Sequence, residues 1–162
     1  MPDGSAQIPQ FDPQKDPFRI ILPASEMSVR RALQRLCAVL SGDLITPDIS
    51  GTLELVLAEA LNNVVEHAYA DGAGIIEVNV SATTHALSIS VKDQGTPMPG
   101  GQVPLGEIPN YPTDPQELPE GGFGWFLIHD LTDNLSYQRQ DECNLLKFDI
   151  PLSGSLPVAE LP

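Results

Sequence analysis

Residues 53–68 read LELVLAEALNNVVEHA, and the rest of the chain is interpreted outward from this stretch. On a helical wheel its apolar residues gather on one broad face: Leu53, Leu57, Ala60, Leu61, Val64 and Ala68. The other side carries Leu55, Glu59, Asn62, Asn63 and Glu66, with His67 at the border. The pattern predicts an amphipathic helix that begins at Thr46-Pro47 and runs to about Tyr69.

The polar side of this helix has an unusual composition. A solvated face usually mixes Lys and Glu in pairs four residues apart, whereas this one has no Lys or Arg and two adjacent asparagines. Glu59 and Asn63 are one helical turn apart, so the carboxylate and the amide lie one above the other. Such oxygen atoms suit Mg²⁺, and a carboxylate near that metal can accept a proton from an attacking hydroxyl. A plain solvated face is the alternative that the residues alone leave open.

The flanking residues predict the remaining elements. Five stretches have strand character: 18–22, 75–82, 87–92, 134–140 and 144–150. Two more have helical character: 28–40, with Ser25 as its N-cap, and 123–131. Strands that gather with the helices set aside indicate an α+β protein built as a two-layer sandwich. Residues 95–122 are rich in proline and glycine, and we expect them to form a mobile lid.

Composition excludes several function classes. The 162 residues suit one domain, and the formal charge of −14 repels nucleic acid and anionic lipid, so we expect neither as a direct partner. Met1–Gln10 is polar and no apolar run could span a bilayer, so we expect a soluble, cytoplasmic protein without a signal peptide. Cys37 and Cys143 lack metal-ligand spacing and are expected to be buried or half-buried free thiols.

Two glycine motifs follow the long helix. The first is Asp93-Gln94-Gly95, where a carboxylate can accept from an exocyclic amine and the glycine lets the backbone approach a flat ring. The second is Gly121-Gly122-Phe123-Gly124, which enters a helix whose free N–H groups favour an anion. Because no Lys or Arg lies between Asp93 and Gln138, phosphates there must be bound by backbone donors and Mg²⁺, without a P-loop. Taken singly, the motifs also fit a turn and a flexible loop.

In this order and spacing, three motifs resemble the nucleotide-binding boxes of the GHKL ATPase superfamily, in the form seen in anti-sigma-factor serine kinases of the RsbW and SpoIIAB type. Residues 59–68 resemble the N-box, Asp93-x-Gly95 the first glycine box and residues 121–128 the second. The resemblance covers roughly residues 17–151 and leaves 1–16 as a disordered N-terminus and 152–162 as a flexible tail. It implies the Bergerat fold: a two-layer α/β sandwich whose mixed sheet is covered by helices on one face, with a flexible ATP lid.

The resemblance also implies the role of individual residues. Asn63 would be the Mg²⁺ ligand, and Glu59 would be the general base that activates an acceptor serine. Asp93 would bind the adenine amine, with Gly95 beneath the ring. The phosphates of ATP or ADP would lie along Gly121, Gly122, Phe123 and Gly124. His67 is expected beside the nucleotide as a packing or supporting residue and not as a base.

By the same resemblance, the chain would be an ATP-binding serine/threonine kinase that acts as an anti-sigma factor. It would phosphorylate a serine of a STAS-domain anti-anti-sigma partner, hold a sigma factor inactive when that partner is modified, and in some cases form a homodimer. The alternative is a non-catalytic module that binds ATP or ADP and switches a partner through ordering of the lid.

Two departures from the family pattern affect these expectations. Cys143-Asn144 stands where family members commonly have a glycine followed by threonine or asparagine, and we expect Asn144 to contribute at the phosphates. Residues 114–120 read DPQELPE, acidic where an arginine is often found, and this favours the non-catalytic alternative. Separately, Arg30, Arg31 and Arg35 form a basic cluster that is either solvated or a docking site for an acidic partner such as a sigma factor.

Overall fold

The computed structural model describes residues 9–40, 42–106 and 123–152. Five strands form one sheet: β1 (Phe18–Pro23), β2 (Ile75–Ala82), β3 (Ala86–Asp93), β4 (Asp133–Gln140) and β5 (Cys143–Pro151). The helices are α1 (Glu26–Val39), α2 (Pro47–Asn63) and α3 (Phe123–Leu131), with a π-helical turn η1 (Val64–Ala68) and a 3-10 turn η2 (Pro99–Gly101). The predicted order of strands and helices is confirmed.

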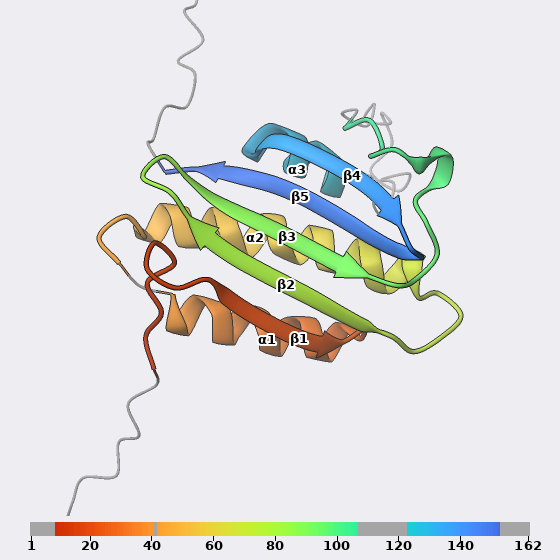
Figure 1. The fold of residues 1–162 in the computed structure, drawn as a ribbon, viewed down its shortest axis with the longest axis horizontal. Coiled ribbons are helices and arrows are strands. Elements are labelled where there is room, and N and C mark those ends of the chain that lie inside the picture. Colours follow the sequence, from red (N-terminus) through yellow and green to blue (C-terminus); the bar gives the residue numbers. More distant parts are fainter. Residues whose placement is uncertain (1–8, 41, 107–122, 153–162) are drawn as a thin grey trace, which may run out of the picture.

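Figure 1 shows the three helices together on one face of the sheet, which confirms the α+β two-layer sandwich. The strand order is β1-β2-β3-β5-β4. Every pairing between these described strands is antiparallel, where we expected a mixed sheet. The reason is the connection after β3. The chain passes through α3 to the edge strand β4, and β5 then returns in the opposite direction and pairs with β3.

Both long helices begin at the N-caps that the sequence predicts. At α1, the Ser25 hydroxyl accepts a hydrogen bond from the Ser28 amide at 3.2 Å. At α2, the Thr46 hydroxyl accepts from the Ile49 amide at 3.3 Å, and Pro47 occupies the first helical position. Each cap satisfies an amide that the helix itself leaves without an acceptor.

α2 is the central element of the core. Its inward residues are almost fully shielded from solvent: Leu53, Val56, Leu57, Ala60 and Leu61. Beyond Asn63 the helix does not continue with regular geometry, because η1 widens it and the Tyr69 amide donates to the Val64 carbonyl at 3.2 Å. A π-turn adds one residue to a turn without changing composition, so the helical spacing of the sequence predicts where the helix ends but not this widening.

Residues 9–16 pack onto the fold, although we expected residues 1–16 to be disordered. The Phe11 ring meets the Phe18 ring edge-on at 5.3 Å, and the Phe11 amide donates to the Val39 carbonyl at 2.7 Å. The Pro13 carbonyl accepts from the Ala82 amide at 2.9 Å. The half-buried Phe11 ring and the paired backbone groups stabilise this segment, although its composition is mostly polar.

The thiols of Cys37 and Cys143 are free and half-buried, as expected. Burial, together with the negative charge of Glu54, raises the pKa of the Cys37 thiol. None of the helices in the described part of the chain is long and apolar enough to cross a membrane.

Leu57→Ala tests whether α2 is the core element that the packing indicates. Leu57 is 1% exposed, so the substitution should lower the free energy of unfolding by about 2–5 kcal/mol. Leu55 lies on the same helix and is 41% exposed, so Leu55→Ala should cost less than about 1 kcal/mol. Urea unfolding monitored by circular dichroism measures both values. Equal losses in the two variants would contradict the assigned helix face.

Candidate functional site

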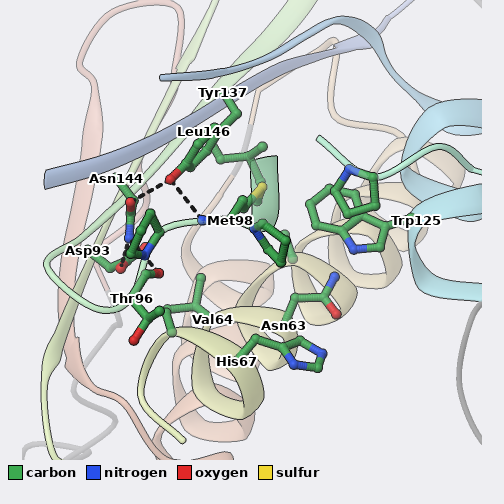
Figure 2. Close-up of a pocket in the computed structure, with 15 residues that line it drawn as sticks. Asn63, Val64, His67, Asp93, Thr96, Met98, Trp125, Tyr137, Asn144 and Leu146 are labelled. Carbon is green, nitrogen blue, oxygen red and sulfur yellow. Dashed lines mark hydrogen bonds between the residues drawn. The ribbon is translucent and has the colours of Figure 1, made fainter. Parts of the chain in front are cut away.

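A cavity of about 420 Å³ lies where α2 and η1 meet the ends of the central strands. It is lined from the helix side by Ala60, Asn63, Val64, His67 and Ala68. Helix α3 contributes Trp125, and the sheet and its loops contribute Asp93, Thr96, Pro97, Met98, Pro99, Pro104, Tyr137, Asn144 and Leu146. Figure 2 shows Asp93 and Asn144 on one side of the cavity, and Asn63 and Trp125 on the other.

Asp93 presents one carboxylate oxygen to the cavity and uses the other structurally. The residue is 5% exposed. Its Oδ1 accepts from the Gly95 amide and from the Asn144 side-chain amide, each at 2.8 Å. Within the described residues no group donates to Oδ2. Because Asp93 lines the cavity and an ionised carboxylate oxygen can only accept hydrogen bonds, Oδ2 is suited to a ligand that carries an N–H group.

Asn144 lies beside Asp93, where its side-chain amide is fully engaged. Its Nδ2 donates to Asp93 Oδ1 at 2.8 Å and to the carbonyls of Gly95 and Thr96, each at 3.2 Å. Its Oδ1 accepts from the Tyr137 hydroxyl at 2.6 Å and from the Arg139 guanidinium at 2.8 Å. We expected this side chain to contribute at the phosphates. It instead holds the carboxylate side of the cavity, because it stands opposite Asp93 in the register of β3 and β5.

Gly95 is fixed by its contact with η1. A Cβ added at Gly95 would lie 2.4 Å from the Ala68 carbonyl oxygen, a separation that real side chains do not reach. The next amide, of Thr96, donates to that same Ala68 carbonyl at 2.8 Å. The end of β3 and the widened turn therefore touch through backbone alone, and only glycine fits between them.

Asn63 carries an unusual feature for a buried amide. Its Nδ2 is shielded from solvent and has no hydrogen-bond partner among the described residues. Buried polar atoms of native proteins are nearly always paired, so an orphan at the wall of a cavity indicates a ligand or water that completes the pairing. His67 lies one turn further along at the same wall, and its exposed side chain forms the rim.

Glu59 is not on a solvated helix face. It is half-buried, and its carboxylate lies against the first turn of α3, where a Cβ added at Gly124 would be 2.6 Å from Glu59 Oε2. Glu59 is therefore only partly solvated, and it is not among the described residues that line the cavity. The lack of a side chain at Gly124 leaves room for the carboxylate one turn before Asn63.

Some predicted site residues cannot be located. Gly121, Gly122 and the lid residues 107–122 lie outside the described residues, and Phe123 begins α3. Sequence reasoning missed Tyr137, Trp125 and the proline-rich wall at 97–104 as lining residues. The alternation of Leu135 and Tyr137 along β4, both half-buried between exposed neighbours, was the available signal that Tyr137 points inward.

The cavity has a definite electrostatic character. No Lys or Arg is among its lining residues in the part of the chain that the structure describes. The same described residues contain no group of three or more His, Cys, Asp or Glu side chains that could hold a metal by themselves. A cation here would need oxygen atoms supplied by a bound ligand, as is usual for Mg²⁺ on phosphates.

Comparison with known proteins gives a consistent result. Residues 22–150 match the family described as "Histidine kinase-like ATPase domain". The chain is 33% identical over 90 residues to the serine-protein kinase RsbW of Oceanobacillus iheyensis, covering 54% of this chain and 57% of the relative. It is 28% identical over 95 residues to the proteins of that name from Bacillus thuringiensis and Bacillus cereus, covering 58% of this chain and 59% of each relative. The chain thus spans less than two thirds of these relatives.

Gly95→Ala tests the backbone contact between β3 and η1. Because the added methyl would overlap the Ala68 carbonyl, we expect a loss of roughly 1–3 kcal/mol in the free energy of unfolding. Gly51→Ala is the control, since nothing lies within 4 Å of its added Cβ and alanine favours the helix. Thermal unfolding of both variants measures the difference. A Gly95→Ala protein as stable as wild type would refute the contact.

Proposed function

Because the chain belongs to the histidine kinase-like ATPase domain family, we propose that its cavity binds ATP or ADP and that the protein is an ATP-dependent serine/threonine kinase. The observation that carries this proposal is the pairing of two incomplete groups across one cavity. Among the described residues, none donates to Asp93 Oδ2 on one side and none accepts from Asn63 Nδ2 on the other. An adenine nucleotide supplies both, as an exocyclic amine and as phosphate oxygens.

At the base, the adenine amine would donate to Asp93 Oδ2, and the ring would lie over the Gly95 backbone. The apolar lining from Val64, Met98 and Leu146 suits a flat heterocycle. The phosphates would lie toward Asn63 and the first turn of α3, along Gly121, Gly122, Phe123 and Gly124. His67 at the rim would contact the nucleotide from the helix side. Asn144 would act indirectly, through Asp93.

Mg²⁺ fits this site through Asn63, whose amide oxygen would be the protein ligand while phosphate oxygens and water supply the rest. The ion would neutralise phosphate charge, which matters because no lining residue among those described is a Lys or Arg. The position of the Asn63 side chain at the cavity wall supports this assignment, while its unpaired Nδ2 is a donor that would face a phosphate oxygen or water.

For phosphoryl transfer, Glu59 would act as the general base. The acceptor serine hydroxyl gives its proton to the Glu59 carboxylate as its oxygen bonds to the γ-phosphorus, and the bond from that phosphorus to the β-phosphate oxygen breaks. The products are phosphoserine and ADP. The half-buried carboxylate beside Gly124 and one turn from Asn63 supports this role.

The proposed physiological partners are a STAS-domain anti-anti-sigma factor, as the acceptor, and a sigma factor, held when the acceptor is phosphorylated. The relatives are named serine-protein kinase RsbW, which supports the kinase part of this proposal. A cytoplasmic location follows from it, because ATP and sigma factors are found there. We also propose that two copies of the chain can form a homodimer.

A non-catalytic module that binds ATP or ADP is the second candidate. It is favoured by one observation: neither the described lining residues nor the sequence of 107–122 contains a Lys or Arg to stabilise a transferred phosphoryl group. Nucleotide binding is common to both candidates, so phosphate transfer to a partner separates them.

The first experiment is a titration of Trp125 fluorescence with ATP, ADP and GTP, with and without Mg²⁺. The indole lines the cavity and is the chain's one tryptophan, so a bound adenine nucleotide should change its emission. Asn63→Ala should weaken Mg²⁺-dependent ATP binding on the order of 10- to 100-fold, as for loss of a contact to a charged group. No saturable response in wild type, confirmed by calorimetry, would sink both candidates.

The catalytic step is tested with Glu59→Gln and labelled ATP, using STAS-domain proteins of the same organism as acceptors. Glu59→Gln should keep ATP binding and lose about 10²- to 10⁴-fold in the rate of transfer. Glu54→Gln is the control, since Glu54 is exposed on the same helix and lies near Cys37 of α1, whereas Glu59 lies against Gly124 of α3. Wild-type protein that binds ATP but labels no STAS partner would favour the non-catalytic module.

The arginine cluster on α1 offers a separate test of the partners. Arg30, Arg31 and Arg35 are exposed, and none of them forms an ion pair within the described residues. In a protein of charge −14 such a cluster would attract an acidic partner.

Replacing Arg31 and Arg35 by glutamate should weaken binding of a sigma factor or STAS partner roughly tenfold, more strongly at low salt. The control carries the same charge change at Lys15 and Lys147, which are exposed elsewhere. Surface plasmon resonance at two salt concentrations measures the effect. Partner affinity that is unchanged by the arginine replacements would end the docking assignment.

A further inference from the structure

The side chain of Tyr137 reaches from the edge strand β4 into the wall of the cavity. Its hydroxyl donates to Asn144 Oδ1 at 2.6 Å and accepts from the Met98 amide at 3.1 Å. We infer that Tyr137 is a positioning residue for recognition of the base, acting through Asn144 on Asp93. The inference rests on the proposed nucleotide site and adds to it the device by which the site selects an amine over a carbonyl.

The first step is the orientation of the Asn144 amide. Three oxygen atoms surround its Nδ2: Asp93 Oδ1 and the carbonyls of Gly95 and Thr96. Two donors face its Oδ1, the Tyr137 hydroxyl and the Arg139 guanidinium. A rotated amide would set oxygen against oxygen on one side and N–H against N–H on the other. The environment therefore permits one orientation, with Nδ2 toward the carboxylate.

The second step is the effect on Asp93. Its Oδ1 receives two donors and is thereby fixed in place, so Oδ2 remains as the acceptor toward the cavity. A fixed carboxylate oxygen accepts from an exocyclic amine and repels a carbonyl oxygen at the same position. Selectivity thus depends on how firmly Asn144 holds Asp93, and not on the presence of the carboxylate alone.

The third step separates the two donors to Asn144. Arg139 is exposed on the edge strand, where solvent competes with its hydrogen bonds. The Tyr137 side chain is half-buried in the cavity wall, and its 2.6 Å O–H···O contact and the 2.8 Å N–H···O contact of Arg139 are each short for their donor type. Tyr137 also holds the Met98 amide, so it fixes part of the cavity wall at the same time. We therefore expect the hydroxyl of Tyr137 to contribute most to the orientation.

Tyr137→Phe tests the inference because it removes the hydroxyl and keeps the ring in the wall. The probes are ATP and inosine triphosphate, which has a carbonyl where adenine has its amine. We expect ATP affinity to fall by about 3- to 10-fold, as for loss of one buried hydrogen bond, with little change for inosine triphosphate. The dissociation constant for inosine triphosphate divided by that for ATP should therefore fall by the same factor. A merely structural role would weaken both nucleotides equally and leave the ratio unchanged.

Tyr69→Phe is the matched control. The Tyr69 hydroxyl also makes two hydrogen bonds, accepting from the Gln94 amide at 2.8 Å and donating to the Ile75 carbonyl at 3.1 Å. It touches neither Asn144 nor the Asp93 side chain through these bonds, so the ratio should stay at its wild-type value. Arg139→Met is the second variant. It removes the exposed donor to Asn144 together with its 2.9 Å hydrogen bond to the Gly95 carbonyl, and it should lower the ratio by less than Tyr137→Phe does.

The outcomes distinguish this inference from the proposed function. The inference is supported if wild type binds ATP and rejects inosine triphosphate, and if the ratio falls in Tyr137→Phe more than in any other variant. If wild type, Tyr137→Phe and Arg139→Met all bind nucleotide with the same ratio, the inference about Tyr137 is overturned and the proposed nucleotide binding is not. Wild type that binds neither nucleotide would overturn the proposed function, and the inference with it. Unfolding midpoints without nucleotide confirm that each variant is folded before its ratio is measured.

Discussion

The packing of α2 on the middle of the sheet is the constraint on which the rest of the molecule depends. One face of this helix is buried from Leu53 to Leu61, and the sheet beneath it presents the buried residues of β2, β3 and β5. The hydrophobic contribution of this interface fixes the height and rotation of the helix. That rotation sets Asn63 at the cavity and leaves Glu59 against α3. The chemical groups are thus placed by apolar residues that take no part in chemistry.

Within that frame, the polar groups of the site follow a simple rule of pairing. Asn144 satisfies Asp93, two carbonyls, a hydroxyl and a guanidinium at once, so the carboxylate side of the cavity is internally complete except for one oxygen. The helix side is incomplete at Asn63. The cavity is therefore fixed by internal hydrogen bonds on its carboxylate side and open to a bound group on its helix side.

Much of this could be predicted from the sequence, and the failures have physical causes. The caps at Ser25 and Thr46, the helix face of α2 and both hairpins follow from local periodicity and capping, which act over a few residues. The contact of Asn144 with Asp93 depends on the register between β3 and β5, strands far apart in the chain, and could not be predicted from local sequence for that reason. The widening at η1 and the packing of Phe11 on Phe18 likewise arise from tertiary contacts that leave no periodic trace.

The saturation of the Asn144 amide has a consequence for how such a sequence can diverge. A serine, threonine or other shorter side chain at position 144 could not form all five of the hydrogen bonds that Asn144 makes. A change there would leave the Tyr137 hydroxyl and the Arg139 guanidinium without their shared acceptor. We therefore expect positions 137, 139 and 144 of this edge hairpin to covary among related sequences. A substitution at one of them would be accompanied by compensating substitutions at the other two.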